Sequence, residues 1–207
     1  RLNNSANRIA FIRNIGGNSQ IFTSLKDGSD VQQVTTVPVT GFKNEELDFA
    51  WESSGNSLIY PNFDKLYRIN KDGSGLTLLY TTPDGNFISE CDWSTDGTKI
   101  ALKTNNNSGY NVKIYIINMQ GSTLATVLSS VNGGAGGINF SIAGDKLLYT
   151  RDVSGYENYL NYRQLDSRIF VYNLNNNTNT DLSALSYKPS GINDLDPRFS
   201  PNDGEII

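Results

Sequence analysis

A phrase that recurs four times along this chain of 207 residues constrains its fold more than any other feature. Each copy places an aromatic residue at the end of an apolar strand, then a turn bearing Ser and Gly, then a second apolar strand. The copies read Trp51-Glu-Ser-Ser-Gly55-Asn-Ser-Leu58, Trp93-Ser-Thr-Asp-Gly97-Thr-Lys-Ile100, Phe140-Ser-Ile-Ala-Gly144-Asp-Lys-Leu147 and Phe199-Ser-Pro-Asn-Asp-Gly204-Glu-Ile-Ile207. A phrase that returns every few tens of residues is typical of repeat architectures, so we expect a chain built from similar units.

Aligned on this phrase, each unit resolves into short strands that are rich in β-branched and aromatic residues and bounded by Gly, Asn, Asp and Ser. The clearest unit is the third, with strands expected at 88–93, 99–103, 112–117 and 124–128. The turn glycines Gly55, Gly97, Gly144 and Gly204 are 42, 47 and 60 residues apart. Four-stranded units of about this length are typical of β-propeller blades, whereas a sandwich or barrel does not explain the returning phrase.

We therefore predict an all-β fold, a β-propeller of four-stranded antiparallel blades in a single domain. The blades are expected at about 1–35, 45–80, 88–128, 136–182 and 192–207. The first of them lacks its first strand and the last is only begun. The chain is interpreted as a fragment, cut at both ends, of a six- to eight-bladed propeller.

The composition argues against several classes of function. The chain has no histidine, which removes the commonest general base and metal ligand, and we expect no catalytic, metal or cofactor site. Its net charge is −4 and its basic residues are scattered, which gives no footprint for nucleic acid. No apolar run reaches the roughly 18 residues of a membrane span, so we expect no direct membrane insertion. The lone Cys91 suits a buried strand position.

Two stretches carry a family resemblance. Asp194-Leu-Asp-Pro-Arg-Phe-Ser-Pro-Asn-Asp-Gly204 and Asp92-Trp-Ser-Thr-Asp-Gly97 resemble the Asp…Pro-x-Trp-Ser-Pro-Asp-Gly repeat of TolB-like β-propellers. The match to this repeat is fair in the second unit and loose in the fourth. The resemblance covers essentially the whole chain. It specifies the fold rather than the function, because its Ser, Asp and Gly build turns and its aromatic residue packs between blades.

The resemblance implies a non-catalytic module that binds or scaffolds protein partners on a propeller face. It also implies a place in the bacterial cell envelope, in the periplasm or at the cell surface. One alternative is the accessory or gating propeller of a prolyl-oligopeptidase-like peptidase whose hydrolase lies in a separate domain, since this chain has no Gly-x-Ser-x-Gly elbow. A further alternative is a propeller that binds carbohydrate.

Loops at one propeller face are the first candidates for a binding site. In a meander blade the loops that enter the first strands and those that join second to third strands share one face, and their lengths vary most. The longest, 151–167, contains Tyr156, Tyr159, Tyr162 and Arg163. Tyrosines of this kind are enriched at interfaces, although they also suit packing on the top of their own blade.

Acidic residues form the second candidate. Asp48, Glu90 and Asp196 stand three residues before the key aromatic of their units, where Gly137 is the exception, and Asp194 lies close by in sequence. If these acids converge near the channel mouth, they would attract a cation, a basic peptide or sugar hydroxyls. The alternative is that each caps a turn or pairs within its own blade.

The aromatic residues of the phrase, Trp51, Trp93, Phe140 and Phe199, are predicted to be packing residues between blades. The Gly-rich run 132–137 leads into a strand rather than a helix, so it does not suit a phosphate cradle. It is interpreted either as a flexible loop or as an inner-strand segment where backbones pack closely.

Overall fold

The computed structural model covers residues 1–207 and describes all of them except 1, 4–6, 40–47, 133, 155–165 and 186–192. The described residues form four antiparallel sheets of four strands each and one short 3-10 helix, η2 (Ser183–Leu185). In every sheet the strands pair in sequence order, so each sheet is a simple meander. The all-β fold predicted from the repeats is confirmed.

The strand boundaries follow the strand-and-turn pattern of the sequence. The first sheet contains β1 (Leu2–Asn3), β2 (Arg8–Ile15), β3 (Asn18–Leu25) and β4 (Gln32–Gln33). The second contains β5 (Ala50–Trp51), β6 (Ser57–Asn62), β7 (Lys65–Asn70) and β8 (Thr77–Thr81). The third contains β9 (Phe87–Trp93), β10 (Lys99–Asn105), β11 (Val112–Asn118) and β12 (Thr123–Val131). The fourth contains β13 (Ala135–Phe140), β14 (Lys146–Asp152), β15 (Ser167–Asn173) and β16 (Thr178–Asp181).

The opening unit differs from the expectation that it lacks a first strand. Leu2 pairs with Ile9 and Asn3 pairs with Arg8, so β1 completes the first sheet. A two-residue strand has no alternating apolar pattern to recognise, because side-chain alternation needs about four residues to show. The first sheet therefore has the same four-stranded topology as the others.

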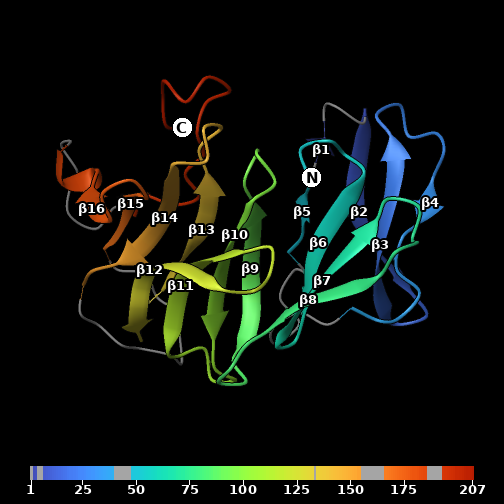
Figure 1. Cartoon of the computed structure of the whole chain (residues 1–207), viewed down its shortest axis with the longest axis horizontal. Coiled ribbons are helices and arrows are strands. Elements are labelled where there is room, and N and C mark those ends of the chain that lie inside the picture. The colour runs from blue at the N-terminus through green and yellow to red at the C-terminus, as the bar shows by residue number, and fades with distance from the viewer. Residues whose placement is uncertain (1, 4–6, 40–47, 133, 155–165, 186–192) are drawn as a thin grey trace.

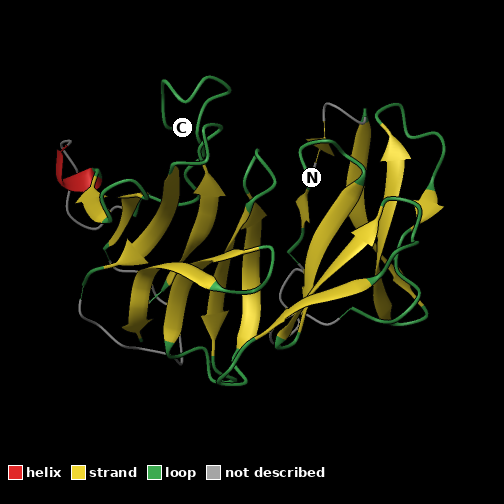
Figure 2. Ribbon diagram, in the orientation of Figure 1, coloured by secondary structure: helices red, strands yellow, loops and turns green. Residues whose placement is uncertain are grey.

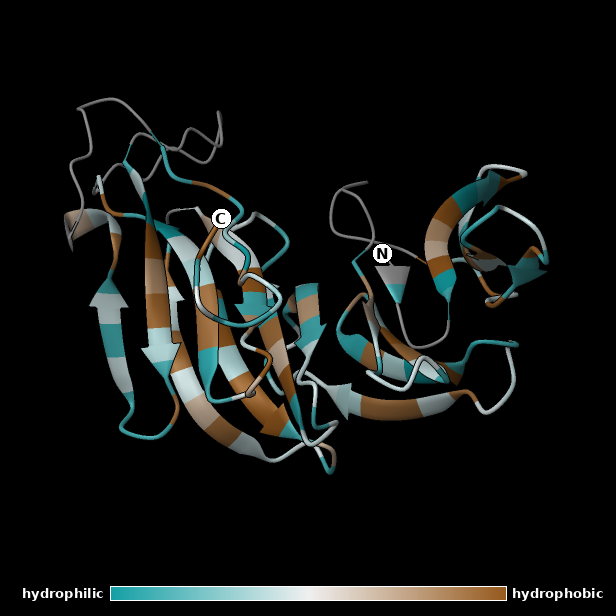
Figure 3. Cartoon of the chain, turned by 90° about the horizontal axis from the view of Figure 1, so that it is seen from above, coloured by the Kyte–Doolittle hydropathy of each residue, from teal (hydrophilic) through white to brown (hydrophobic). Residues whose placement is uncertain are grey.

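The four sheets follow one another along an arc, with neighbours packed face to face (Figures 1 and 2). Seen from above, the strands carry most of the hydrophobic colour and the connecting turns are mainly hydrophilic (Figure 3). An apolar cluster fills each of the three spaces between neighbouring sheets. Trp51 belongs to the first of these clusters, Trp93 to the second and Phe140 to the third. Three of the four aromatic residues of the phrase are thus confirmed as packing between sheets.

The start of a fifth unit follows the fourth sheet. Phe199 and Ile206 form an isolated antiparallel bridge, and Phe199 is only partly buried, outside the three clusters. The fourth copy of the phrase also aligns differently from the sequence expectation. Its turn is closed by a hydrogen bond from the Asp203 N–H to the Ser200 carbonyl, so Asp203, at φ 55°, occupies the place that Gly144 holds in the fourth unit.

Asp203 uses this position to hold the preceding unit. Its carboxylate accepts hydrogen bonds from the backbone N–H groups of Ile142 at 2.8 Å and Ala143 at 3.0 Å. These two N–H groups lie at the centre of the turn that ends at Gly144, where no backbone carbonyl reaches them. Glycine would adopt this conformation more easily but has no carboxylate to accept these bonds. The two hydrogen bonds of the Asp203 side chain therefore offset the cost of its positive φ.

We expect Asp203→Ala to loosen this contact between the fourth and fifth units. A hydrogen bond contributes about 1 kcal/mol net, so the amide hydrogens of Ile142 and Ala143 should exchange on the order of five-fold faster. Native-state hydrogen exchange measures this, with the Gly97 amide in the third unit as the internal reference. Unchanged exchange at both positions would contradict the assignment.

Side-chain acceptors on the first strands join neighbouring sheets in a second way. Glu90 and Asp92 on β9 accept hydrogen bonds from the backbone N–H groups of Ile138 at 3.2 Å and Phe140 at 2.8 Å on β13. Asn139, which stands directly before its aromatic as Asp92 does, accepts one from the Phe199 N–H at 3.2 Å. Because these N–H groups belong to the next unit, each bond fixes the angle and register of one sheet against its neighbour.

Candidate binding face

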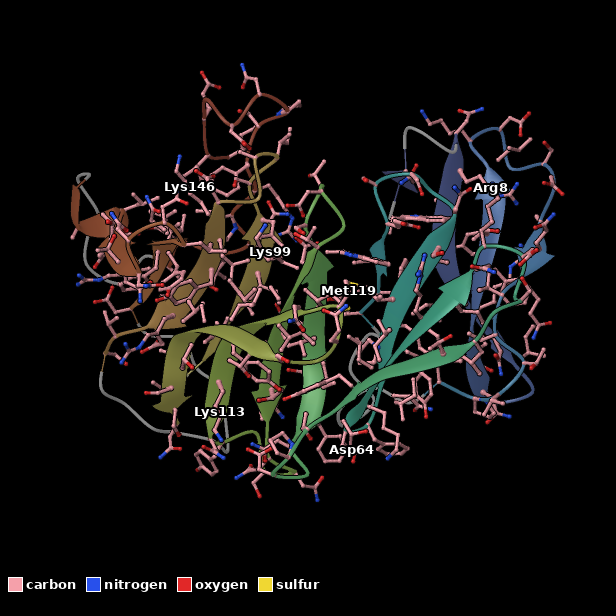
Figure 4. The ribbon with its side chains drawn as sticks, viewed as in Figure 1. Arg8, Asp64, Lys99, Lys113, Met119 and Lys146 are labelled. Carbon is pink, nitrogen blue, oxygen red and sulfur yellow. The ribbon has the colours of Figure 1, made fainter. Side chains whose placement is uncertain are left out.

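Loops from neighbouring units gather at one end of the sheets. Asp64 and Lys113 lie at this end in Figure 4, and Lys99 lies at the opposite end. We call this end the loop face and define it by residues 13–19, 61–64, 81–87 and 104–111. It comprises the turns that join second to third strands in the first three sheets, together with the connection from β8 to β9.

Asparagine side chains build the turns of the loop face. The Asn14 side-chain oxygen accepts a hydrogen bond from the Gly17 N–H at 2.8 Å. The Asn106 side-chain oxygen accepts two, from the N–H groups of Ser108 and Tyr110, both at 2.9 Å. Asparagine suits such turns because its short side chain bonds the backbone a few residues on. The asparagine tract at 105–107 thus lies at the end of β10 and in the following turn, as its composition indicates.

An exposed aromatic residue stands in the middle of this face. Phe63 is 48% exposed and is the only aromatic among the large apolar residues that are strongly exposed in the described part of the chain. Its ring lies 5.8 Å from the ring of Phe87, centroid to centroid, in a tilted arrangement. The backbone carbonyl of Phe63 accepts a hydrogen bond from the Ile88 N–H at 2.9 Å, which ties the β6–β7 turn to the start of β9.

Charged residues that lie near these two aromatic residues in sequence form ion pairs. Asp64 pairs with Lys65 at 2.9 Å, and Asp84 pairs with Lys113 at 2.7 Å. Burial pushes the pKa of Asp84 upward, but hydrogen bonds from the Lys113 ammonium and the Asn86 N–H outweigh it and hold that pKa below its usual range. A hydrogen bond to Asp64 raises the pKa of Lys65. Each pair thus joins one carboxyl group to one amino group across 2.9 Å or less.

The sequence reasoning did not identify Phe63. The signal lay in Asn62-Phe63-Asp64-Lys65, where a bulky aromatic occupies a two-residue hairpin turn that normally takes Gly or Asn. The sequence places residues 61–64 in a loop, but the exposure and the positive φ of Phe63 are known only from the structure.

The tyrosine candidates lie outside the described residues. Tyr156, Tyr159, Tyr162 and Arg163 all fall within 155–165. Their role in binding stays a prediction.

The acidic candidates have different neighbours. Asp48 accepts hydrogen bonds from its neighbour Phe49 at 3.0 Å and from the Cys91 N–H on β9 at 2.8 Å. Glu90 pairs with Lys103 at 2.9 Å and also accepts the bond from β13 described above. The pairing of Glu90 with Lys103 on β10 is the pairing within one blade that the sequence alternative predicted. Asp48 and Glu90 also bond the first strand of the next sheet, which neither sequence hypothesis included.

The remaining two acids lie at the start of the fifth unit. Asp194 accepts a hydrogen bond from the Ser183 hydroxyl, and its N–H donates to the Ser167 carbonyl at 3.0 Å. Asp196 is exposed, with φ 50°, and lies against Gly137 of β13. A shared binding site for the four acids stays a prediction.

The described residues contain no group of three or more acidic or cysteine side chains placed to hold a metal ion. Cys91 is buried in the cluster between the second and third sheets. Among the described residues, no helix is long and apolar enough to cross a membrane. The loop face presents an exposed aromatic ring, paired charges and the backbone amides of its turns.

The chain resembles solved protein structures in its fold. No family model and no curated protein matches the chain. TolB from Acinetobacter baumannii matches 97% of this chain and 45% of its own length at 15% identity, with a TM-score of 0.64. Putative TolB from Agrobacterium tumefaciens matches 85% of this chain and 61% of its own length at 20% identity, with a TM-score of 0.62.

A third solved structure is the tricorn protease, which matches 81% of this chain and 17% of its own length at 12% identity, with a TM-score of 0.54. The chain spans about half the length of the two TolB structures. At identities this low the likeness shows the fold alone, and the same fold serves a protease as well.

Proposed function

We propose that this chain, which has the fold of the TolB-like β-propellers, is a non-catalytic module that binds a protein partner on its loop face. The observation that carries the proposal is the exposure of Phe63 among loops from neighbouring units. Aromatic residues are enriched at the centre of protein interfaces. A place in the bacterial cell envelope follows from the sequence resemblance and belongs to the same proposal.

We expect a photo-reactive amino acid on the loop face to cross-link the full-length protein to a polypeptide in extract of its source cells. Ile15, 51% exposed beside the β2–β3 turn, is a suitable position because it lies on the loop face outside the Phe63 turn. Leu124, 52% exposed on β12, is the matched control away from that face. Cross-linking is read by mass shift on a gel. Equal cross-linking from both positions, or none from Ile15, would count against the proposal.

The tricorn protease likeness favours a second candidate function, that of a propeller accessory to a peptidase. The present chain then contributes binding or gating, while a separate domain supplies the catalytic groups. The reading frame of the full-length protein discriminates the two candidates, because a hydrolase domain in the same frame favours the peptidase.

A further inference from the structure

Phe63 holds a backbone conformation that its own side chain disfavours. Its φ is 55°, in the left-handed region. Asn62 pairs with Lys65 across the hairpin, which leaves Phe63 and Asp64 as the two turn residues. Such turns take Gly or Asn where φ is positive, and a bulky residue there is a steric outlier. The turn therefore stores strain that asparagine in the same place would largely relieve.

The contacts that hold this turn do not need the ring. The Ile88 N–H donates to the Phe63 carbonyl and the Thr82 N–H donates to the Asp64 carbonyl, both at 2.9 Å. Both bonds are made by the backbone, so any residue at position 63 forms them. The ring itself packs on Phe87 and stays about half exposed. The fold gains little from phenylalanine in return for its strain, and strained residues cluster where a protein binds.

The charged groups next to Phe63 and Phe87 in sequence already have partners. Asp64 is paired with Lys65, and the Asp84 oxygens accept from Lys113 and from both N–H groups of Asn86, backbone and side chain. A sugar or another polar small molecule is recognised through polar groups that converge on it with bonding capacity to spare. A protein hot spot needs instead an aromatic ring surrounded by near-neutral contacts that exclude water. The surroundings of Phe63 fit a protein partner better than a sugar.

We infer that Phe63, resting on Phe87, is the anchor on which an apolar side chain of a partner protein packs. This inference rests on the function proposed above and adds the residue and the chemistry of the contact. Because the turn fixes the ring before binding, little side-chain entropy is lost when the partner docks. The inference therefore predicts that replacing Phe63 weakens binding of the partner and does not lower the stability of the chain.

The test uses Phe63→Asn, with Leu124→Asn as a control that removes an equally exposed apolar side chain on β12. The probes are peptides selected from a random phage-displayed library on the immobilised wild-type chain. We expect Phe63→Asn to weaken their binding by about 30-fold or more, as a hot-spot residue does. Its melting temperature should equal or exceed that of the wild type. Leu124→Asn should bind the peptides as the wild type does.

Each other result bears on the inference. Equal peptide affinity for the wild type and Phe63→Asn overturns the inference and leaves the proposed function in place, because the peptides then bind elsewhere. A melting temperature lowered by about 5 °C or more makes Phe63 a structural residue and overturns it as well. A glycan array on which wild-type signal is lost in Phe63→Asn assigns the ring to sugar instead. A library that yields no wild-type binder, together with no cross-link from Ile15, overturns the proposed function too.

Discussion

Trp93→Ala is expected to destabilise the chain by about 3–5 kcal/mol, the usual cost of emptying a buried tryptophan site. Trp93 is 7% exposed and belongs to the apolar cluster between the second and third sheets. The Arg68 guanidinium lies over its ring, 5.6 Å from the centroid, and comes from the second sheet. The substitution therefore removes contacts that hold two sheets together. Urea unfolding followed by far-ultraviolet circular dichroism measures the change without relying on tryptophan fluorescence.

Trp93→Phe is the matched control. The indole Nε1 of Trp93 is buried without a hydrogen-bond partner in the described structure, so phenylalanine removes an unsatisfied donor together with part of the ring. The fourth unit already places Phe140 at the equivalent position. We expect Trp93→Phe to cost about 1–2 kcal/mol, well below the cost of Trp93→Ala. A Trp93→Ala chain that unfolds within about 1 kcal/mol of the wild type would contradict the assignment of this cluster.

Gly136→Ala is expected to cost about 2–3 kcal/mol, because an added methyl group meets a carboxylate that is held in place. A Cβ at position 136 would lie 2.3 Å from Glu90 Oε1. Glu90 is fixed by the Lys103 ammonium at 2.9 Å and by the Ile138 N–H at 3.2 Å. The carboxylate can move aside only by giving up one or both of these bonds, and the ion pair is largely shielded from water.

A double-mutant cycle with Glu90→Ala tests this cause directly. Once the carboxylate is absent, Gly136→Ala should cost less than about 1 kcal/mol, which makes the coupling energy between the two positions about 2 kcal/mol. Chemical unfolding of the four chains provides the values. Additive costs would show that the alanine methyl group clashes with something other than Glu90.

The strands and turns were predictable from the sequence because their causes are local. The pleat places alternate side chains on opposite faces, so each unit shows its strands as short apolar and β-branched runs. The last position of each turn has a positive φ, which explains Gly55, Gly97 and Gly144. The strand β1 and the one-residue shift at Asp203 were not predicted, because two residues show no pattern and aspartate can occupy the same conformation as glycine.

The loop face was predictable only in part. Loop positions follow from strand order, so the sequence indicated which turns share an end. The partners of Asp48 and Glu90 did not follow, since their hydrogen bonds run to a strand more than forty residues away in the next sheet. Phe63 was missed for a related reason, because its strain and exposure depend on the hairpin register and on the neighbouring β9.

The Gly-rich run 132–137 also shows what composition indicates and what only the packing of the sheets decides. Its composition left open a flexible loop or a close approach of backbones. The structure shows close approach at the two glycines that lie in β13: Gly136 faces Glu90 and Lys103, and Gly137 faces Asp196 and Pro197. Which side chains press on a glycine depends on the packing of neighbouring sheets, and no local pattern records it.

The sequence alone determined that this chain is a series of four-stranded units, because backbone hydrogen bonding, side-chain alternation and turn conformation all act within a few residues. The tertiary structure alone decided how the units join. It showed that Asp48 and Glu90 accept hydrogen bonds from the next sheet, and it placed a strained phenylalanine on the loop face. These features arise from contacts between residues far apart in the chain, whose free energies depend on distance, burial and register in space.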